Sequence, residues 1–292
     1  ADCQHARINA RYLPDCVFPH NLVCGAHLSD VLLSDACILV TPTVGLRTTL
    51  QQLKQLNQPI PPIIWACKGF EQGSALLPHQ VVGQELPEHP VGVLSGPSFA
   101  KEVAQGLPAA LTLASLDTAF AQTWMHALSA PRLRLYASDD MIGVEVGGAV
   151  KNILAIAAGI SDGLQLGMNA RAALLTRGLA EMTRLVVALG GKQESAMGLS
   201  GMGDLVLTAT GHLSRNRKVG EQLAQGLGLE AILAQLGHVA EGVATTKAVL
   251  SQAQALGVEM PICEAVGQVL FAGEHPKDAL ERLLNRTPKK EG

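Results

Sequence analysis

Aromatic and charged residues are both scarce in this sequence of 292 residues. Phe, Trp and Tyr together make up 3% of it and the charged residues 16%, whereas hydrophobic residues reach 48%. A chain with this apolar content is not disordered, and its core must be filled mainly by Ala, Leu, Val and Ile. The length predicts about two domains of roughly 150 residues each.

A strong charge of one sign is also absent, because 22 Lys and Arg nearly balance 25 Asp and Glu, for a net charge of −3. We therefore expect no nucleic-acid partner, since such binding needs a basic surface. An anionic small molecule would need a local group of cations. The apolar run over residues 153–160 is far shorter than the roughly 20 residues of a membrane span, so no stable membrane insertion is predicted.

The six cysteines form no CxxC pair, and no His cluster shows metal spacing. This pattern predicts reduced thiols in a cytoplasmic protein rather than a zinc site. The sequence has no basic and then apolar leader and does not begin with Met. We expect it to be the interior of a longer chain.

Short apolar runs alternate with helix-like segments in the first half of the sequence. The runs cover residues 36–41, 62–67, 91–95, 109–114 and 133–136. This alternation predicts an α/β fold, a Rossmann-like, doubly wound and mostly parallel sheet. Ligands of such sheets bind beyond the carboxyl ends of the strands, which here carry Thr41-Pro-Thr43, Lys68-Gly69 and Ser95-Gly-Pro-Ser98.

The second half shows helical spacing and no clear strand signal. Leu174, Leu175, Leu179, Met182 and Val186 form one apolar stripe within a predicted helix over residues 170–189. Further helices are expected over residues 217–225, 229–236, 244–256 and 265–271. We therefore predict a partial dinucleotide-binding domain over residues 1–138 and an all-α domain over residues 139–292, and the apolar helical half suggests a homodimer.

The GxGxxG fingerprint that binds dinucleotides is missing after every predicted strand. Gly198-Leu-Ser-Gly-Met-Gly203 has its glycines in another order and lies in the helical half. Its spacing alone favours a tight turn at a helix end.

Four segments carry residues suited to chemistry, each with an ordinary structural alternative. Lys68 follows a strand and either reaches a ligand or lies solvated in a turn. Ser95-Gly-Pro-Ser-Phe-Ala-Lys-Glu102 has amides that either hold an anion or simply begin a helix. Lys151 interrupts an apolar helix, where it is either a base with a lowered pKa or a snorkelling side chain. The basic Ser214-Arg-Asn-Arg-Lys218 either binds phosphate or forms a solvated helix start.

Six motifs in one order resemble bacterial NAD(P)-dependent glycerol-3-phosphate dehydrogenases, and the similarity runs from about residue 11 to about residue 272. The motifs are Trp65-Ala-Cys-Lys-Gly69, Leu94-Ser-Gly-Pro-Ser-Phe-Ala-Lys-Glu102, Gly147-Gly-Ala-Val-Lys-Asn152, Arg177-Gly-Leu-Ala-Glu-Met182, Gly201-Met-Gly-Asp-Leu-Val-Leu-Thr208 and Ser214-Arg-Asn-Arg217. The resemblance implies interconversion of sn-glycerol 3-phosphate and dihydroxyacetone phosphate with NAD or NADP, in the cytoplasm, at the entry to phospholipid synthesis.

The resemblance also implies a role for particular residues. Lys151 matches the proton acceptor of the family. The implied substrate contacts are Lys68, Gly96, Ser98, Lys151, Asp204, Ser214, Arg215 and Asn216. The implied cofactor contacts are Lys68, Ala100, Arg215, Val239 and Glu241.

Two departures from the family pattern stand out. Family members begin with a strand, a Gly-rich turn, a helix and a second strand, all of which should precede Arg11. This chain lacks them, so we expect a fragment, or a chain defective in cofactor binding if it is complete. Cys67 stands where Thr or Ser is expected.

Two other functions stay open on the sequence. One is a truncated, non-catalytic protein that binds a phosphorylated metabolite, which the missing Gly-rich turn favours. The other is a related two-domain dehydrogenase of a hydroxy acid, for which Ser214-Arg-Asn is an unexpected binding motif.

Overall fold

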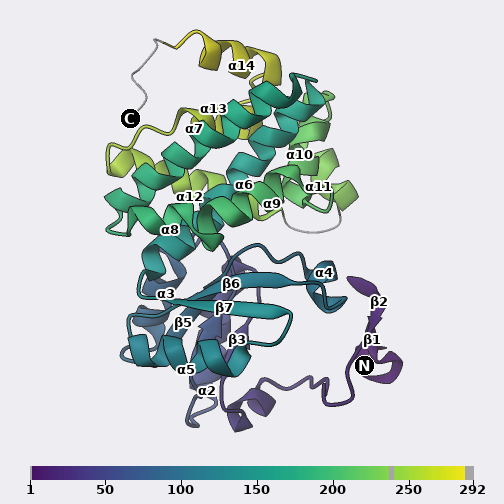
Figure 1. The fold of residues 1–292 in the computed structure, drawn as a ribbon, viewed down its shortest axis with the longest axis vertical. Helices are drawn as coiled ribbons and strands as arrows, with labels where there is room; N and C mark the ends of the chain where they lie inside the picture. The colour runs from purple at the N-terminus through teal and green to yellow at the C-terminus, as the bar shows by residue number, and fades with distance from the viewer. Residues whose placement is uncertain (1, 237–239, 287–292) are drawn as a thin grey trace. The chain divides into compact units, whose positions relative to one another are not determined.

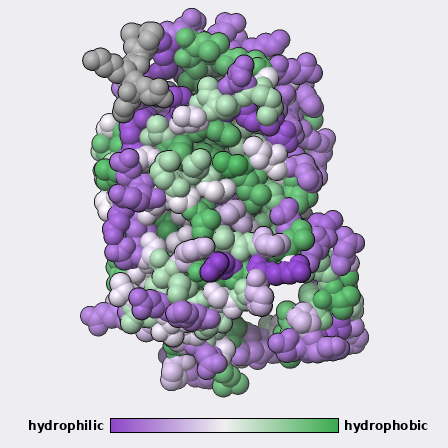
Figure 2. Space-filling view, in the orientation of Figure 1, coloured by the Kyte–Doolittle hydropathy of each residue, from purple (hydrophilic) through white to green (hydrophobic). Residues whose placement is uncertain are grey.

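The computed structural model of the protein describes residues 2–236 and 240–286. Its internal contacts divide the chain into two compact units. The sheet unit contains residues 1–67 and 79–141, and the helical unit contains residues 68–78 and 142–292. Polar and apolar residues are interspersed on the face shown in Figure 2.

Five strands form the sheet of the first unit (Figure 1). They are β3 (Cys37–Leu39), β4 (Ile63–Trp65), β5 (Val91–Ser95), β6 (Ala109–Ala114) and β7 (Leu133–Ser138). Neighbours are parallel except β5 and β6, so the predicted mostly parallel α/β sheet is confirmed. The described strands lie in chain order, without the reversal of order at the switch point of a doubly wound sheet.

The inner part of this sheet is buried. Ile63, Ile64 and Trp65 of the inner strand β4 have no exposed surface, as expected for a strand covered on both faces. The antiparallel pair β1 (Ile8–Asn9) and β2 (Leu13–Val17) lies outside this sheet. The helices of the unit are α1 (Asp2–Ala6), α2 (Leu46–Gln55), α3 (Pro78–Glu85), α4 (Ala100–Ala104) and α5 (Thr118–Leu128).

The second unit contains helices and no strand among its described residues, and its part after residue 141 is helical as the sequence predicts. Its helices are α6 (Met141–Gly163), α7 (Gly167–Ala188), α8 (Gln193–Met197), α9 (Asp204–Thr210), α10 (Arg215–Ala224), α11 (Leu229–Leu236), α12 (Glu241–Ala255), α13 (Pro261–Phe271) and α14 (Pro276–Leu284). Helix α6 begins at the boundary between the units. In the described part of the chain it alone is long and apolar enough to cross a membrane, but 94% of that stretch is buried in the protein. Its apolar character is therefore that of a core helix.

The segment 68–78 belongs to the helical unit although it directly follows β4. Phe70 and Leu77 are buried in the helical core, and Gln252 Nε2 donates a hydrogen bond to the Ala75 carbonyl oxygen at 2.8 Å. Sequence patterns grouped this segment with the sheet, because a core contact with distant helices leaves no local signal. As a result, Lys68 is held by the helical unit.

Glycines let three helical segments approach one another closely. A Cβ on Gly147 of α6 would lie 2.9 Å from the Ser200 carbonyl oxygen, and a Cβ on Gly159 only 1.9 Å from that of Arg217. Gly147 and Gly159 therefore let the α6 backbone lie against the segment before α9 and against α10.

All six cysteines are free, in agreement with the predicted reduced thiols. Cys37, Cys67 and Cys263 are buried, and burial raises the pKa of the Cys37 and Cys263 thiols. These buried thiols act as small apolar residues of the core.

Candidate active site

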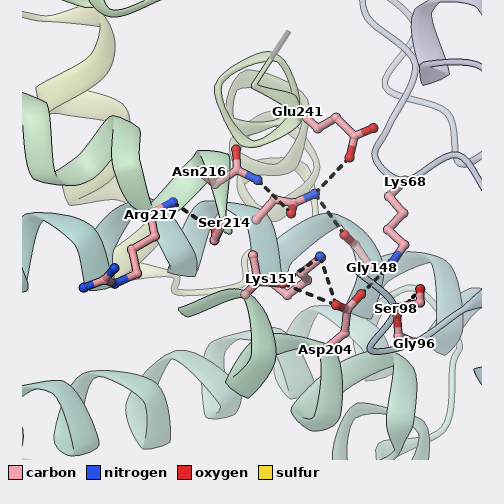
Figure 3. A network of polar contacts seen from close by, with 12 residues as sticks. Lys68, Gly96, Ser98, Gly148, Lys151, Asp204, Ser214, Asn216, Arg217 and Glu241 are labelled. Atoms are coloured by element: carbon pink, nitrogen blue, oxygen red, sulfur yellow. Dashed lines mark hydrogen bonds and ion pairs between the residues drawn. The ribbon is translucent and has the colours of Figure 1, made fainter. Parts of the chain in front are cut away.

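Two lysines meet one aspartate inside the helical unit (Figure 3). Asp204, the first residue of α9, accepts hydrogen bonds from Lys68 Nζ at 2.6 Å and from Lys151 Nζ at 3.1 Å. Lys151 Nζ also donates to Thr208 Oγ1 at 2.8 Å. Because Asp204 and Thr208 are four residues apart on α9, both face the same point of α6.

Burial controls the ionisation of this cluster. Lys151 is only 7% exposed. This burial and the nearby Lys68 ammonium lower the pKa of Lys151 to about 8, although Asp204 and Glu241 oppose the shift. Burial alone would raise the pKa of Asp204, but the positive charges of Lys68 and Lys151 outweigh it and the net shift is downward. The cluster therefore places a carboxylate that stays ionised beside an amine with a pKa of about 8.

A chain of amides extends the cluster along α6. Asn216 Nδ2 donates to Asn152 Oδ1 at 2.9 Å, and Asn216 Oδ1 accepts from the Gly242 N–H at 3.0 Å. Asn152 Nδ2 lies 3.4 Å from Glu241 Oε2. A Cβ on Gly242 would lie 2.7 Å from the Asn152 carbonyl oxygen, so glycine is required where α12 begins beside α6. These contacts fix Asn152, Asn216 and Glu241 next to Lys151.

The two arginines of the basic segment 214–218 differ in their contacts. Ser214 is the N-cap of α10, and its Oγ accepts a hydrogen bond from the Arg217 N–H at 3.2 Å. Arg217 forms ion pairs with Asp162 at 2.7 Å and Glu221 at 2.9 Å. Arg215 is exposed, and its side chain has no hydrogen bond or ion pair within the described residues. Of these two arginines, Arg215 is the one whose guanidinium is available to a ligand within the described part of the chain.

Three of the predicted contacts belong to the sheet unit and not to the helical unit that contains this cluster. Gly96, Ser98 and Ala100 belong to the sheet unit, and Ser98 Oγ donates to the Gly96 carbonyl oxygen at 3.1 Å. Gly96 has φ +142°, and a Cβ there would lie 3.1 Å from the Ala110 carbonyl oxygen, so this position requires glycine. Val239 lies outside the described residues.

Thr208 and Asn152 take part in the cluster but were missing from the predicted site. Both lie in the quoted motifs, and their spacing offered a signal. Thr208 follows Asp204 by one helical turn, and Asn152 is the neighbour of Lys151 on a buried helix. Polar residues at such buried positions are normally held by hydrogen bonds, as both are.

A mostly parallel α/β unit, followed by a helical unit whose buried lysine exchanges a proton near pH 8, is typical of a two-part dehydrogenase that uses a dinucleotide. The chain belongs to the family of NAD-dependent glycerol-3-phosphate dehydrogenases. Residues 1–121 match the family's N-terminal part and residues 140–281 its C-terminal part.

Similar proteins cover almost the whole chain. The glycerol-3-phosphate dehydrogenase [NAD(P)+] of Aromatoleum aromaticum is 54% identical, over 98% of this chain and 88% of that protein. The corresponding enzyme of Thiobacillus denitrificans is 55% identical over the same shares. The crystal structure of glycerol-3-phosphate dehydrogenase from Coxiella burnetii has a TM-score of 0.93 and 43% identity, covering 98% of this chain and 88% of that one.

These similarities confirm the predicted enzyme class, its NAD or NADP cofactor and the order of an α/β part followed by a helical part. They favour this enzyme over the hydroxy-acid dehydrogenase and the non-catalytic binding protein. The predicted absence of an N-terminal strand and Gly-rich turn stays a prediction.

Proposed function

We propose that Lys151 is the general base when the chain oxidises sn-glycerol 3-phosphate to dihydroxyacetone phosphate. The observation that carries this role is the burial of its Nζ between Asp204 and Thr208, with a pKa of about 8. The neutral amine takes the proton of the secondary hydroxyl group. In the reverse direction the ammonium returns that proton to the carbonyl oxygen.

Asp204 and Lys68 are proposed to position Lys151 and set its charge. Asp204 holds both ammonium groups, so the Lys151 amine is directed by the Asp204 and Thr208 oxygens. Lys68 adds a positive charge that favours the neutral form of Lys151. Lys68, which we also propose as a contact of both substrate and cofactor, can stabilise negative charge on the reacting oxygen.

The phosphate group of the substrate is proposed to bind Ser214, Arg215 and Asn216. The exposed Arg215 guanidinium suits phosphate oxygens, and the Ser214 hydroxyl retains its hydrogen for donation. Asn216 uses one of its two amide hydrogens on Asn152. Binding this remote group helps to place the reacting carbon. The proposed contacts of Gly96 and Ser98 rest on the family motif.

The cofactor contacts are proposed for Lys68, Ala100, Arg215, Val239 and Glu241. Within the described residues the donor set fits a nicotinamide dinucleotide, because Arg215 is unpaired and suits phosphate, while Glu241 can accept hydrogen bonds from hydroxyl or amide groups. When bound, NAD(P) supplies the acceptor or donor of the hydride. The chain's own residues hold and move the proton.

We further infer a homodimer, a cytoplasmic location and a place at the entry to phospholipid synthesis. The large apolar helical unit supports the dimer, and the free cysteines support the reducing cytoplasm. The apolar helix α6 is buried, as in a water-soluble protein.

The pH dependence of kcat/KM in both directions tests this function. Because oxidation needs neutral Lys151, its kcat/KM should rise about tenfold per pH unit below about pH 8 and level off above it. Reduction needs the ammonium form and should fall above about pH 8. Measurements should start near pH 6.5, since phosphate monoesters titrate at about pH 6. Flat profiles in both directions would remove Lys151 from the proton step.

A further inference from the structure

A pocket lies within the helical unit, and Lys151 is not among the residues that line it. It has a volume of about 930 Å³ and is lined by parts of α6, α7, α13 and α14, including Leu174, Ile262, Leu280 and Leu283. A smaller apolar recess of about 50 Å³ shares these four residues. Lys68, Lys151 and Asp204 do not line either space. Pockets of about 300–1,000 Å³ are typical of sites for small organic molecules.

One buried hydroxyl group lines both spaces. Ser161 of α6 is only 3% exposed, and its Oγ has no hydrogen-bond partner within the described part of the chain. A buried hydroxyl without a partner is uncommon, because it loses its hydrogen bonds to water without replacement. Ser161 therefore marks the place where a bound molecule would present a polar atom.

The charges around the larger pocket favour an anion. Glu181 already accepts hydrogen bonds from the Ile262 and Cys263 N–H groups, at 2.7 and 3.1 Å. Arg184 donates to the Glu259 carbonyl oxygen at 2.7 Å, and Arg286 lies 3.6 Å from the Glu259 carboxylate. Arg177 also lines the pocket, and its side chain has no hydrogen bond or ion pair in residues 2–236 and 240–286.

Arg177 belongs to the motif Arg177-Gly-Leu-Ala-Glu-Met182, for which the proposed reaction gives no role. Glu181 explains one part of this motif, because it ties α7 to the first turn of α13. Gly178 explains another, since a Cβ there would lie 2.6 Å from Leu154 Cδ2. Arg177 is exposed beside the pocket, and no contact among the described residues explains its guanidinium. On the face shown in Figure 2, apolar surface is interspersed with polar residues over the helical unit.

We propose that this pocket binds a long-chain acyl anion, with one aliphatic chain, a carbonyl group near its head and an anionic head. The chain lies among the apolar side chains, the Ser161 hydroxyl donates to the carbonyl oxygen, and Arg177 pairs with the head. A separate observation supports each part of this ligand. The apolar lining supports the chain, the unpartnered hydroxyl supports the carbonyl group, and the unpaired guanidinium supports the anionic head.

Three probes of similar length separate the three contacts. N-lauroylglycine has the chain, the carbonyl and the charge, pentadecanoate lacks the amide carbonyl, and N-lauroylethanolamine lacks the charge. Isothermal titration below their micelle concentrations should find N-lauroylglycine the tightest. Shortening its acyl chain by two methylenes should weaken Kd by about 15-fold, which is the effect of about 0.8 kcal/mol per buried methylene.

Variants of the pocket then test each contact. Ser161→Ala should weaken the binding of N-lauroylglycine about fivefold and leave the affinity for pentadecanoate unchanged. Arg177→Gln should weaken the binding of both anions about tenfold and leave the binding of N-lauroylethanolamine unchanged. The matched control is Arg134→Gln, which removes an exposed arginine of β7. Ala173→Trp adds bulk from an exposed lining position and should abolish binding without disturbing the core.

Two results would overturn the proposal. One is equal affinity of the probes for the parent chain and for Ala173→Trp, which would place binding elsewhere. The other is no probe binding, together with a dimer in sedimentation that Ala173→Trp dissociates. In that case a second copy of the chain covers the pocket.

Discussion

Replacing Lys151 with Met lowers turnover of sn-glycerol 3-phosphate by about 10²–10⁴-fold, the usual contribution of a positioned proton acceptor. The substitution keeps the length and apolar stem of the side chain and removes the amine that Asp204 and Thr208 hold. Because the proposed phosphate contacts are untouched, substrate affinity should change far less than kcat. Steady-state kinetics gives the change in kcat, and a separate binding measurement gives the change in substrate affinity.

Lys218→Met is the matched control, since Lys218 is an exposed lysine of α10. It should retain normal turnover. Near-normal turnover of Lys151→Met would show that another group takes the proton. Loss of substrate binding in parallel with turnover would instead make Lys151 a binding residue.

The second large effect is expected for Asp204→Asn. The change leaves Lys68 and Lys151 next to each other without the carboxylate that pairs with both, at 2.6 and 3.1 Å. Breaking a buried ion pair by removal of one partner costs about 3–5 kcal/mol, so the free energy of unfolding should fall by about that amount. Since Asp204 raises the pKa of Lys151, its loss should also move the midpoint of the oxidation profile below about pH 8.

Denaturant unfolding and the pH profile measure the two effects of Asp204→Asn. Glu281→Gln on the exposed surface of α14 removes a negative charge that has no ion pair within the described residues. It should change neither the free energy of unfolding nor the pH profile. A stable Asp204→Asn variant with an unchanged profile would mean that Asp204 does not set the charge of Lys151.

The sequence predicted the sheet well because its strands carry a local signal. A Pro, Gly or polar residue follows four of the five apolar runs, and the five expected strands match β3 to β7. Helix α14 was missed, although Pro276 after His275 is a typical helix start and its apolar residues lie at helical spacing. The antiparallel pairing of β5 with β6 had no local signal, because pairing direction depends on the path of the chain between strands.

The site was predictable in its residues but not in its contacts. Chemistry and resemblance singled out Lys68, Lys151 and Asp204, yet 136 residues separate Lys68 from Asp204 in the chain. Their meeting depends on two tertiary features, the docking of segment 68–78 on the helical core and the close approach at Gly147. The ion pairs of Arg217 with Asp162 and Glu221, which occupy one of the two candidate phosphate-binding arginines, likewise depend on packing.

Direct titration of the Lys151 amine tests the central claim that burial in this cluster prepares it as a base. Chains labelled with ¹³C at lysine Cε can be titrated by nuclear magnetic resonance, with the Lys151→Met variant identifying the signal. The account predicts that this one signal titrates at about pH 8. A midpoint near about 10.4, the ordinary value for lysine, would contradict it.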